Sequence, residues 1–146
     1  MTLVQDMLQV KFLAVLIAAV VLMVLGFIWY TVFAKQWSAY TGWTREKVQQ
    51  QPQSQMMMSY GLTFVSAFVQ AWVLAGLFNV IGITSATGVP ILTALGLAAL
   101  VWAGFVAAPS VSNFAFEHRP WGLWAIINGL YLVNLLVAGI ILVILK

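Results

Sequence analysis

The sequence has no cysteine and few charged residues. Of 146 residues, 3 are acidic and 6 are Lys or Arg, so charged side chains make up 6% of the chain, against about 25% in an ordinary soluble domain. The absence of cysteine excludes a disulfide framework, a thiolate zinc site and thiol catalysis. The scarcity of charge excludes a water-soluble globule, because too little polar surface is available to cover one.

The basic residues do not form a cluster. The formal net charge is +3. The positive side chains are spread along the chain, at Lys11, Lys35, Arg45, Lys47, Arg119 and Lys146. Nucleic-acid binding needs a concentrated basic face, so we predict no nucleic-acid partner.

Three consecutive methionines, Met56, Met57 and Met58, suggest a metal at first sight. Thioethers bind copper(I), but successive helical residues point in different directions and methionine commonly fills gaps in packing. We therefore predict no metal site. The sequence also lacks a glycine-rich phosphate loop or a set of metal ligands, and we predict no cofactor.

Apolar residues, in contrast, make up 64% of the chain and give a mean hydropathy of +1.04. Four uncharged apolar runs, at about 12–33, 57–81, 89–108 and 121–145, are near the roughly 20 residues that a helix needs to cross a bilayer. Open strand edges cannot satisfy their backbone groups in lipid. We predict a single membrane domain over residues 1–146, all-α, folded as a four-helix transmembrane bundle.

Turn-forming and aromatic residues mark the connections. Gly82, Gly88 and Pro90 place a turn between the second and third runs. Aromatic residues recur at every third position across 37–43, which favours a short interfacial segment between the first and second helices.

Lysine and arginine in the connections indicate the orientation. The connections after the first and third runs carry four of them, and the opposite side carries two. Because such residues are enriched on the cytoplasmic side, we predict a multi-pass protein of the cell (inner) membrane with both termini non-cytoplasmic.

Small residues recur at every fourth position in the second and third runs. The two rows are Thr63, Ala67, Ala71 and Ala75, and Ala99, Ala103 and Ala107. Such rows let helix backbones approach closely in lipid. We predict that these two helices form a tight antiparallel hairpin.

Gln70, Asn128 and Tyr131 are candidate ligand contacts within the runs. Asn128 and Tyr131 are three positions apart and are expected to share a helix face. Together with Gln70, they could line a polar cavity or serve as interhelical hydrogen-bond partners.

Glu117, His118 and Arg119 bring an acid, an imidazole and a base together. Histidine is the side chain that takes up a proton at mild acidity, and its two neighbours could tune that uptake or bind a polar headgroup. Alternatively, the three residues mark the membrane surface and the start of the last helix.

Two segments resemble a known family. Residues 24–30, Val-Leu-Gly-Phe-Ile-Trp-Tyr, followed by Lys-Gln-Trp at 35–37 and Thr-Gly at 41–42, resemble the opening of the domain-of-unknown-function family numbered 1761. Residues 116–121, Phe-Glu-His-Arg-Pro-Trp, with the following helix to Tyr131, resemble that family's second signature. Here Leu130 separates Gly129 from Tyr131, where the family has an adjacent Gly-Tyr.

The resemblance covers nearly the whole chain. It implies a small four-span bacterial membrane protein and brings no activity or cofactor. It makes Trp29, Tyr30, Arg119 and Pro120 candidate signature residues.

Three classes of function remain. The first is a binding or assembly module in the lipid bilayer, either a homo-oligomer or an accessory subunit of a larger membrane complex. The alternative is a passive channel or transporter for a small neutral solute. A membrane enzyme is the least supported class, because no catalytic constellation of titrating groups is visible.

Overall fold

The computed structural model describes residues 2–83 and 91–145, which are mostly helical and contain no strand. Four helices or helix runs are long and apolar enough to cross a membrane, as predicted for an all-α four-helix transmembrane bundle. The elements are α1 (Leu3–Leu8), α2 (Phe12–Val32), α3 (Ala34–Thr41), α4 (Arg45–Gln49), α5 (Gln53–Ile81), α6 (Ile91–Trp102), η2 (Ala103–Ala107), α7 (Ala108–Phe116) and α8 (Trp121–Ile144).

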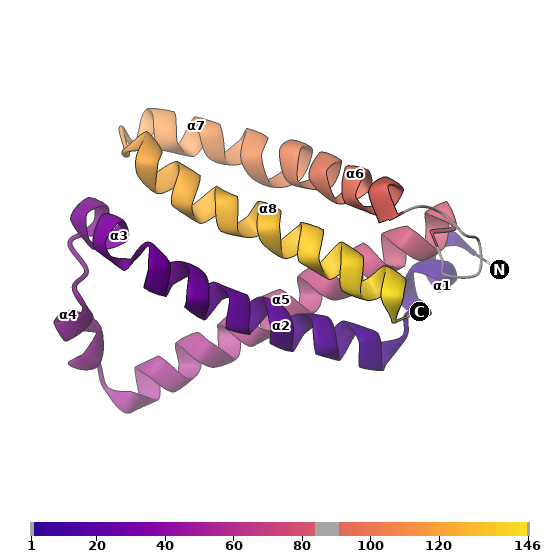
Figure 1. The fold of residues 1–146 in the computed structure, drawn as a ribbon, viewed down its shortest axis with the longest axis horizontal. Coiled ribbons are helices and arrows are strands. Elements are labelled where there is room, and N and C mark those ends of the chain that lie inside the picture. Colours follow the sequence, from indigo (N-terminus) through magenta and orange to yellow (C-terminus); the bar gives the residue numbers. More distant parts are fainter. Residues whose placement is uncertain (1, 84–90, 146) are drawn as a thin grey trace.

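Helix α8 lies at the centre of the bundle and packs against α2, α5 and α6. Figure 1 shows α3, α4 and the connection between α7 and α8 at one end of the molecule, and both termini at the other. Helix α5 crosses α2, and its first half diverges from α8 (Figure 1). The connections after the first and third spans, which carry most of the basic residues, therefore lie at one end of the molecule. The side of the membrane that this end faces stays a prediction.

The predicted hairpin between the second and third spans is wrong. Helix α5 packs mainly on α2, and α6 packs on α8. In the third span Ala94 and Ala98 are buried, and both lie 3.9 Å from the position that a Cβ on Gly139 would occupy. The glycine lets the α6 backbone approach α8. Of the expected row, Ala99 and Ala103 are not buried, whereas Ala107 is.

The third span changes its helical geometry near Pro109. Helix α6 passes into the π-helical segment η2 and continues as α7 to Phe116, so the helical run reaches beyond the expected end at residue 108. Proline has no N–H to donate, and its ring clashes with the carbonyl four residues earlier, here that of Phe105. A π segment just before the proline widens the helix and accommodates both effects.

Helix α1 is an element that was not predicted from the sequence. Its N-terminus is closed by a capping box between Thr2 and Gln5. The Nδ2 of Asn79 on α5 donates hydrogen bonds to Gln9 O at 2.7 Å and Asp6 O at 3.3 Å. These contacts hold the N-terminal segment on the last turns of α5. The predicted turn residues Gly88 and Pro90 lie outside the described residues.

Candidate functional site

Two adjoining cavities lie beside α5, where it diverges from α8. The larger cavity has a volume of about 930 Å³ and is lined from α2, α3, α4, α5 and α8. The smaller cavity has a volume of about 380 Å³ and lies between α5, the third span and α8. Both volumes fall within or near the range of sites for small organic ligands.

The two cavities differ in the chemistry of their walls. The polar residues of the larger cavity are Tyr30, Thr31, Arg45, Tyr60, Thr63, Ser66, Gln70, Tyr131 and Asn134. The smaller cavity is mostly aliphatic, with Val69, Val73, Leu74, Leu77, Val101, Val106 and Leu135 in its wall. A cavity with polar groups in part of its wall therefore lies beside a mostly aliphatic cavity.

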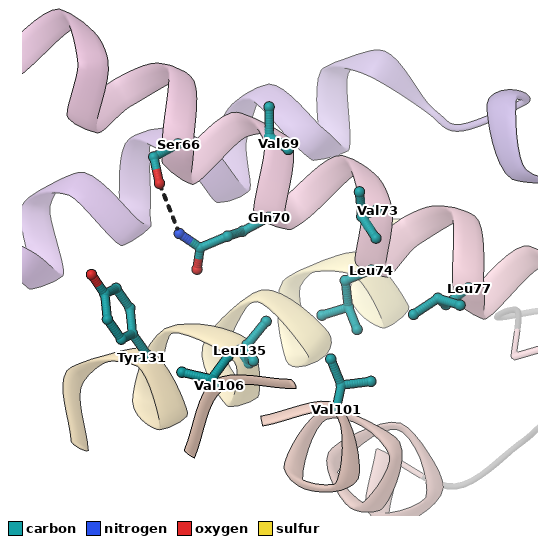
Figure 2. A pocket seen from close by; sticks show the side chains of 10 residues that line it. All are labelled: Ser66, Val69, Gln70, Val73, Leu74, Leu77, Val101, Val106, Tyr131 and Leu135. Carbon is teal, nitrogen blue, oxygen red and sulfur yellow. Dashed lines mark hydrogen bonds between the residues drawn. The ribbon is translucent and has the colours of Figure 1, made fainter. Parts of the chain in front are cut away.

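Gln70, Ser66 and Tyr131 line both cavities and mark their junction. The Nε2 of Gln70 donates a hydrogen bond of 3.2 Å to Ser66 Oγ on the preceding turn of α5. Figure 2 shows the Gln70 side chain extending toward the α8 side, where Tyr131 stands. The structure thus brings together Gln70 and Tyr131, two of the residues selected from the sequence.

Asn134, one turn after Tyr131, is the most confined polar group of the larger cavity. Its residue is 7% exposed, and its Oδ1 has no hydrogen-bond donor among the described residues. Buried polar atoms in folded proteins nearly always have a partner. Asn134 is one of the few polar residues within the fourth apolar run, which was the available signal, but it was not among the candidate ligand contacts.

The signature residues Trp29 and Tyr30 have different surroundings. The Nε1 of Trp29 donates a 2.9 Å hydrogen bond to Ile126 O, and its ring lies against Gly129, 3.2 Å from the position of a Cβ there. Trp29 therefore fixes α2 to α8. Tyr30 lines the larger cavity.

Asn128 lies apart from the cavities, in a hydrogen-bonded network between the third span and α8. Its Oδ1 is 3.1 Å from Ser110 Oγ, and its Nδ2 donates to Trp124 O at 3.1 Å. Trp124 Nε1 donates to Ser110 Oγ at 2.9 Å, and Trp102 Nε1 donates to Asn128 O at 2.8 Å. The expected shared ligand face of Asn128 and Tyr131 is therefore not formed: Asn128 is 2% exposed and does not line either cavity.

Glu117, His118 and Arg119 form the turn between α7 and α8. Arg119 Nη1 is 3.5 Å from Glu117 Oε2, and its guanidinium lies 4.2 Å from the centre of the Phe114 ring. Glu117, His118 and Arg119 line neither cavity. Pro120 then precedes α8 as its N-cap residue. The arrangement around this segment closes one helix and begins the next.

Comparison with known proteins gave one family. A family model described as "Protein of unknown function (DUF1761)" matches residues 13–143. No curated protein and no solved structure matches the chain.

Proposed function

The chain belongs to the DUF1761 family, and we propose that it is a membrane-embedded binding protein that holds one amphipathic, lipid-like molecule beside α5. The observation that carries this proposal is the junction of the two cavities at Gln70 and Tyr131. The larger cavity supplies hydrogen-bonding groups for a polar end. The smaller cavity supplies an aliphatic wall for a hydrocarbon chain.

The polar residues of the larger cavity that lie within the spans support the binding of a specific ligand rather than ordinary contact with bilayer lipid. A bilayer chain needs no hydrogen bonds, and polar residues within spans are commonly functional or paired across helices. Gln70 bonds within its own helix to Ser66, and among the described residues its side chain donates no hydrogen bond to another helix. Its position fits ligand contact better than bundle assembly.

The proposal is tested by a substitution that fills the space where the two cavities meet. Ser66→Trp places a bulky ring where both cavities meet, and Val65→Trp is the matched control, because Val65 is 55% exposed and lines neither cavity. Binding of oleyl alcohol to the protein in lipid nanodiscs is measured by native mass spectrometry. We expect Ser66→Trp to lower the bound fraction at least about tenfold, and the control to change it less than about twofold. Equal binding by the two variants contradicts the proposal.

Assembly with a second copy is a second candidate, favoured by the outer face of the third span. This run is the least buried of the four, with 17% of its apolar window inside the protein. A Cβ on Gly96 or Gly104 would meet nothing within 4 Å, so small residues that favour close helix contact face outward. If they form a dimer contact, Gly96→Leu converts a dimer to a monomer in native mass spectra.

Passive passage of a neutral solute stays an alternative prediction. It was based on Gln70 and Asn128 acting as one lining, but Asn128 is engaged with Ser110 and Trp124 instead. Solute flux into proteoliposomes that disappears in Gln70→Leu would favour this alternative over retention of a ligand.

A further inference from the structure

The larger cavity has a positive charge in its wall. Among the described residues that line the two cavities, Arg45 alone carries a formal charge. It is the first residue of α4, and it is exposed. Val48, three positions later on this helix, also lines the larger cavity, and residues three apart share a helix face. The side of α4 that faces the cavity therefore carries Arg45, whereas Glu46 and Lys47 line neither cavity.

The guanidinium of Arg45 has no acidic partner in the part of the chain that the structure describes. The ion pair found there joins Arg119 to Glu117, in the turn between α7 and α8. The neighbouring cation Lys47 donates a hydrogen bond of 3.1 Å from Nζ to Gly42 O. A guanidinium presents its N–H donors in a planar fork that matches a carboxylate or a phosphate. The charge of Arg45 is therefore available to an anion from outside the chain.

Two tyrosines add hydrogen-bond donors to the same wall. Tyr30 is near the end of α2, and Tyr60 is near the start of α5. The ring of Tyr60 lies 5.4 Å from that of Phe27 on α2, another residue of this wall. A phenol O–H can donate to an anionic oxygen. The part of the larger cavity nearest to α4 thus combines a cation with neutral donors.

We propose that the bound amphiphile carries an anionic head group, a carboxylate or a phosphate monoester, which pairs with Arg45 while the hydrocarbon chain extends along α5 toward the smaller cavity. This inference rests on the proposed binding function and specifies the charge of the ligand and its direction. Figure 1 shows α4 beside the start of α5, at one end of the molecule. Leu77, in the wall of the smaller cavity, is 17 residues after Tyr60, which is about 25 Å along the helix axis. That length accommodates a long alkyl chain.

The opposite direction is unfavourable for an anion. The larger cavity has the apolar residues Leu22, Ala67 and Leu130 in its wall, and the smaller cavity is mostly aliphatic. An ion buried there would lose its hydration without gaining a partner of opposite charge. Arg45 lies outside the spans and is exposed, so an anion beside it gains a partner and keeps part of its water.

Three probes with the same alkyl chain test the charge of the head group. Protein in nanodiscs of zwitterionic lipid is offered equal amounts of oleyl phosphate, oleate and oleyl alcohol, at an alkaline pH that ionises both acids, and the adducts are counted by native mass spectrometry. In Arg45→Gln we expect the ratio of anion to alcohol to fall at least about threefold, as for loss of an exposed ion pair. A fall for oleate alone assigns a carboxylate, and a fall for oleyl phosphate alone assigns a phosphate.

The control variant is Lys47→Gln, which removes the same charge from the same short helix. Because Lys47 lines neither cavity, we expect this variant to keep the wild-type ratio. An equal fall in both variants, or an unchanged ratio in Arg45→Gln, overturns the anionic assignment and leaves the proposed binding function intact. If the wild-type protein binds none of the three probes, both proposals are overturned.

The direction of the chain has a separate test that also decides the proposal if Arg45→Gln does not fold. A fatty acid with a diazirine at its methyl end is crosslinked to the wild-type protein and to Ser66→Trp, so that labels from bulk lipid are common to both. We expect the labels specific to the wild type to lie on α5 around Val73 and Leu77, which line the smaller cavity. Specific labels on α4 and Tyr60 instead overturn the proposed direction. The same labels on both proteins overturn the binding function as well.

Discussion

His118 has a left-handed backbone conformation, with a φ of 53°. It occupies the position that follows the C-cap of α7, where glycine is usual. The Arg119 amide donates to Phe114 O at 3.1 Å, and the His118 amide lies 3.4 Å from Ala115 O, which is the hydrogen-bond pattern of a Schellman motif. The position of His118 is therefore explained by helix termination, and Arg119 packs on Phe114 across the same turn.

Replacing His118 with glycine should stabilise the protein. A left-handed conformation costs a residue with a Cβ about 1–2 kcal/mol, whereas glycine adopts it freely. We expect His118→Gly to raise the free energy of unfolding by about 1 kcal/mol, measured by chemical unfolding in detergent. His118→Ala, which keeps the Cβ, should give no such gain. Equal gains in both variants would show that the imidazole, not the backbone, sets the effect.

Asn128 and Gln70 should differ in their contribution to stability. Asn128 is 2% exposed and bonded to the third span, so Asn128→Leu should lower the free energy of unfolding by about 1–3 kcal/mol. Gln70 bonds only along its own helix to Ser66 in the described contacts, and Gln70→Leu should cost less than about 0.6 kcal/mol. Unfolding of the two variants in the same detergent checks this. A larger loss for Gln70→Leu would contradict the separation of packing and binding residues.

At the scale of elements, the four spans could be predicted because length and hydropathy alone decide whether a helix can cross a bilayer. The helix against which each span packs could not be predicted. A row of small residues indicates that a helix face packs closely, but not which helix it meets: Ala67 and Ala71 are buried in the core shared with α2, not against the third span. Seven residues separate Ile83 from Ile91, so the sequence does not force α6 back onto α5.

The candidate site was predictable in part for a related reason. Gln70 and Tyr131 stand out as polar residues within apolar runs, and both line the cavities. Asn128 and Tyr131 are about 60° apart around α8. From their spacing in the sequence alone, two such residues are expected on one helix face. Because α8 is surrounded by α2, α5 and α6, that rotation is enough to place Asn128 toward the third span and Tyr131 toward α5. Sequence spacing carries no information about how many neighbours surround a helix.

The docking of α1 depends on a close backbone contact. A Cβ on Gly76 would lie 2.7 Å from Met7 O, so Gly76→Ala should displace α1 from α5. We expect faster amide exchange across residues 3–8 and a loss of about 1–3 kcal/mol in the free energy of unfolding. Gly61→Ala on the same helix is the control, because its added Cβ meets nothing within 4 Å. Unchanged exchange in Gly76→Ala would contradict the docking contact.

At the scale of the whole molecule, the shared end of the basic connections predicts the orientation in the membrane. Since the chain has no cysteine, single cysteines at Thr2 and Gln50 can be labelled in intact cells without further changes. We expect a membrane-impermeant thiol reagent to label Thr2→Cys from outside, and Gln50→Cys only after the membrane is opened. The reverse pattern would invert the orientation, and labelling of both from one side would contradict the arrangement of the spans.

We expect one amphiphile to occupy the cavities beside α5. The most direct measurement is a native mass spectrum of the protein released gently from its own membrane, compared with that of Ser66→Trp prepared in the same way. We expect one bound molecule of lipid-like mass on each wild-type chain and a sharp loss of that adduct in the variant. Bare wild-type chains, or the same adduct on both proteins, would contradict it.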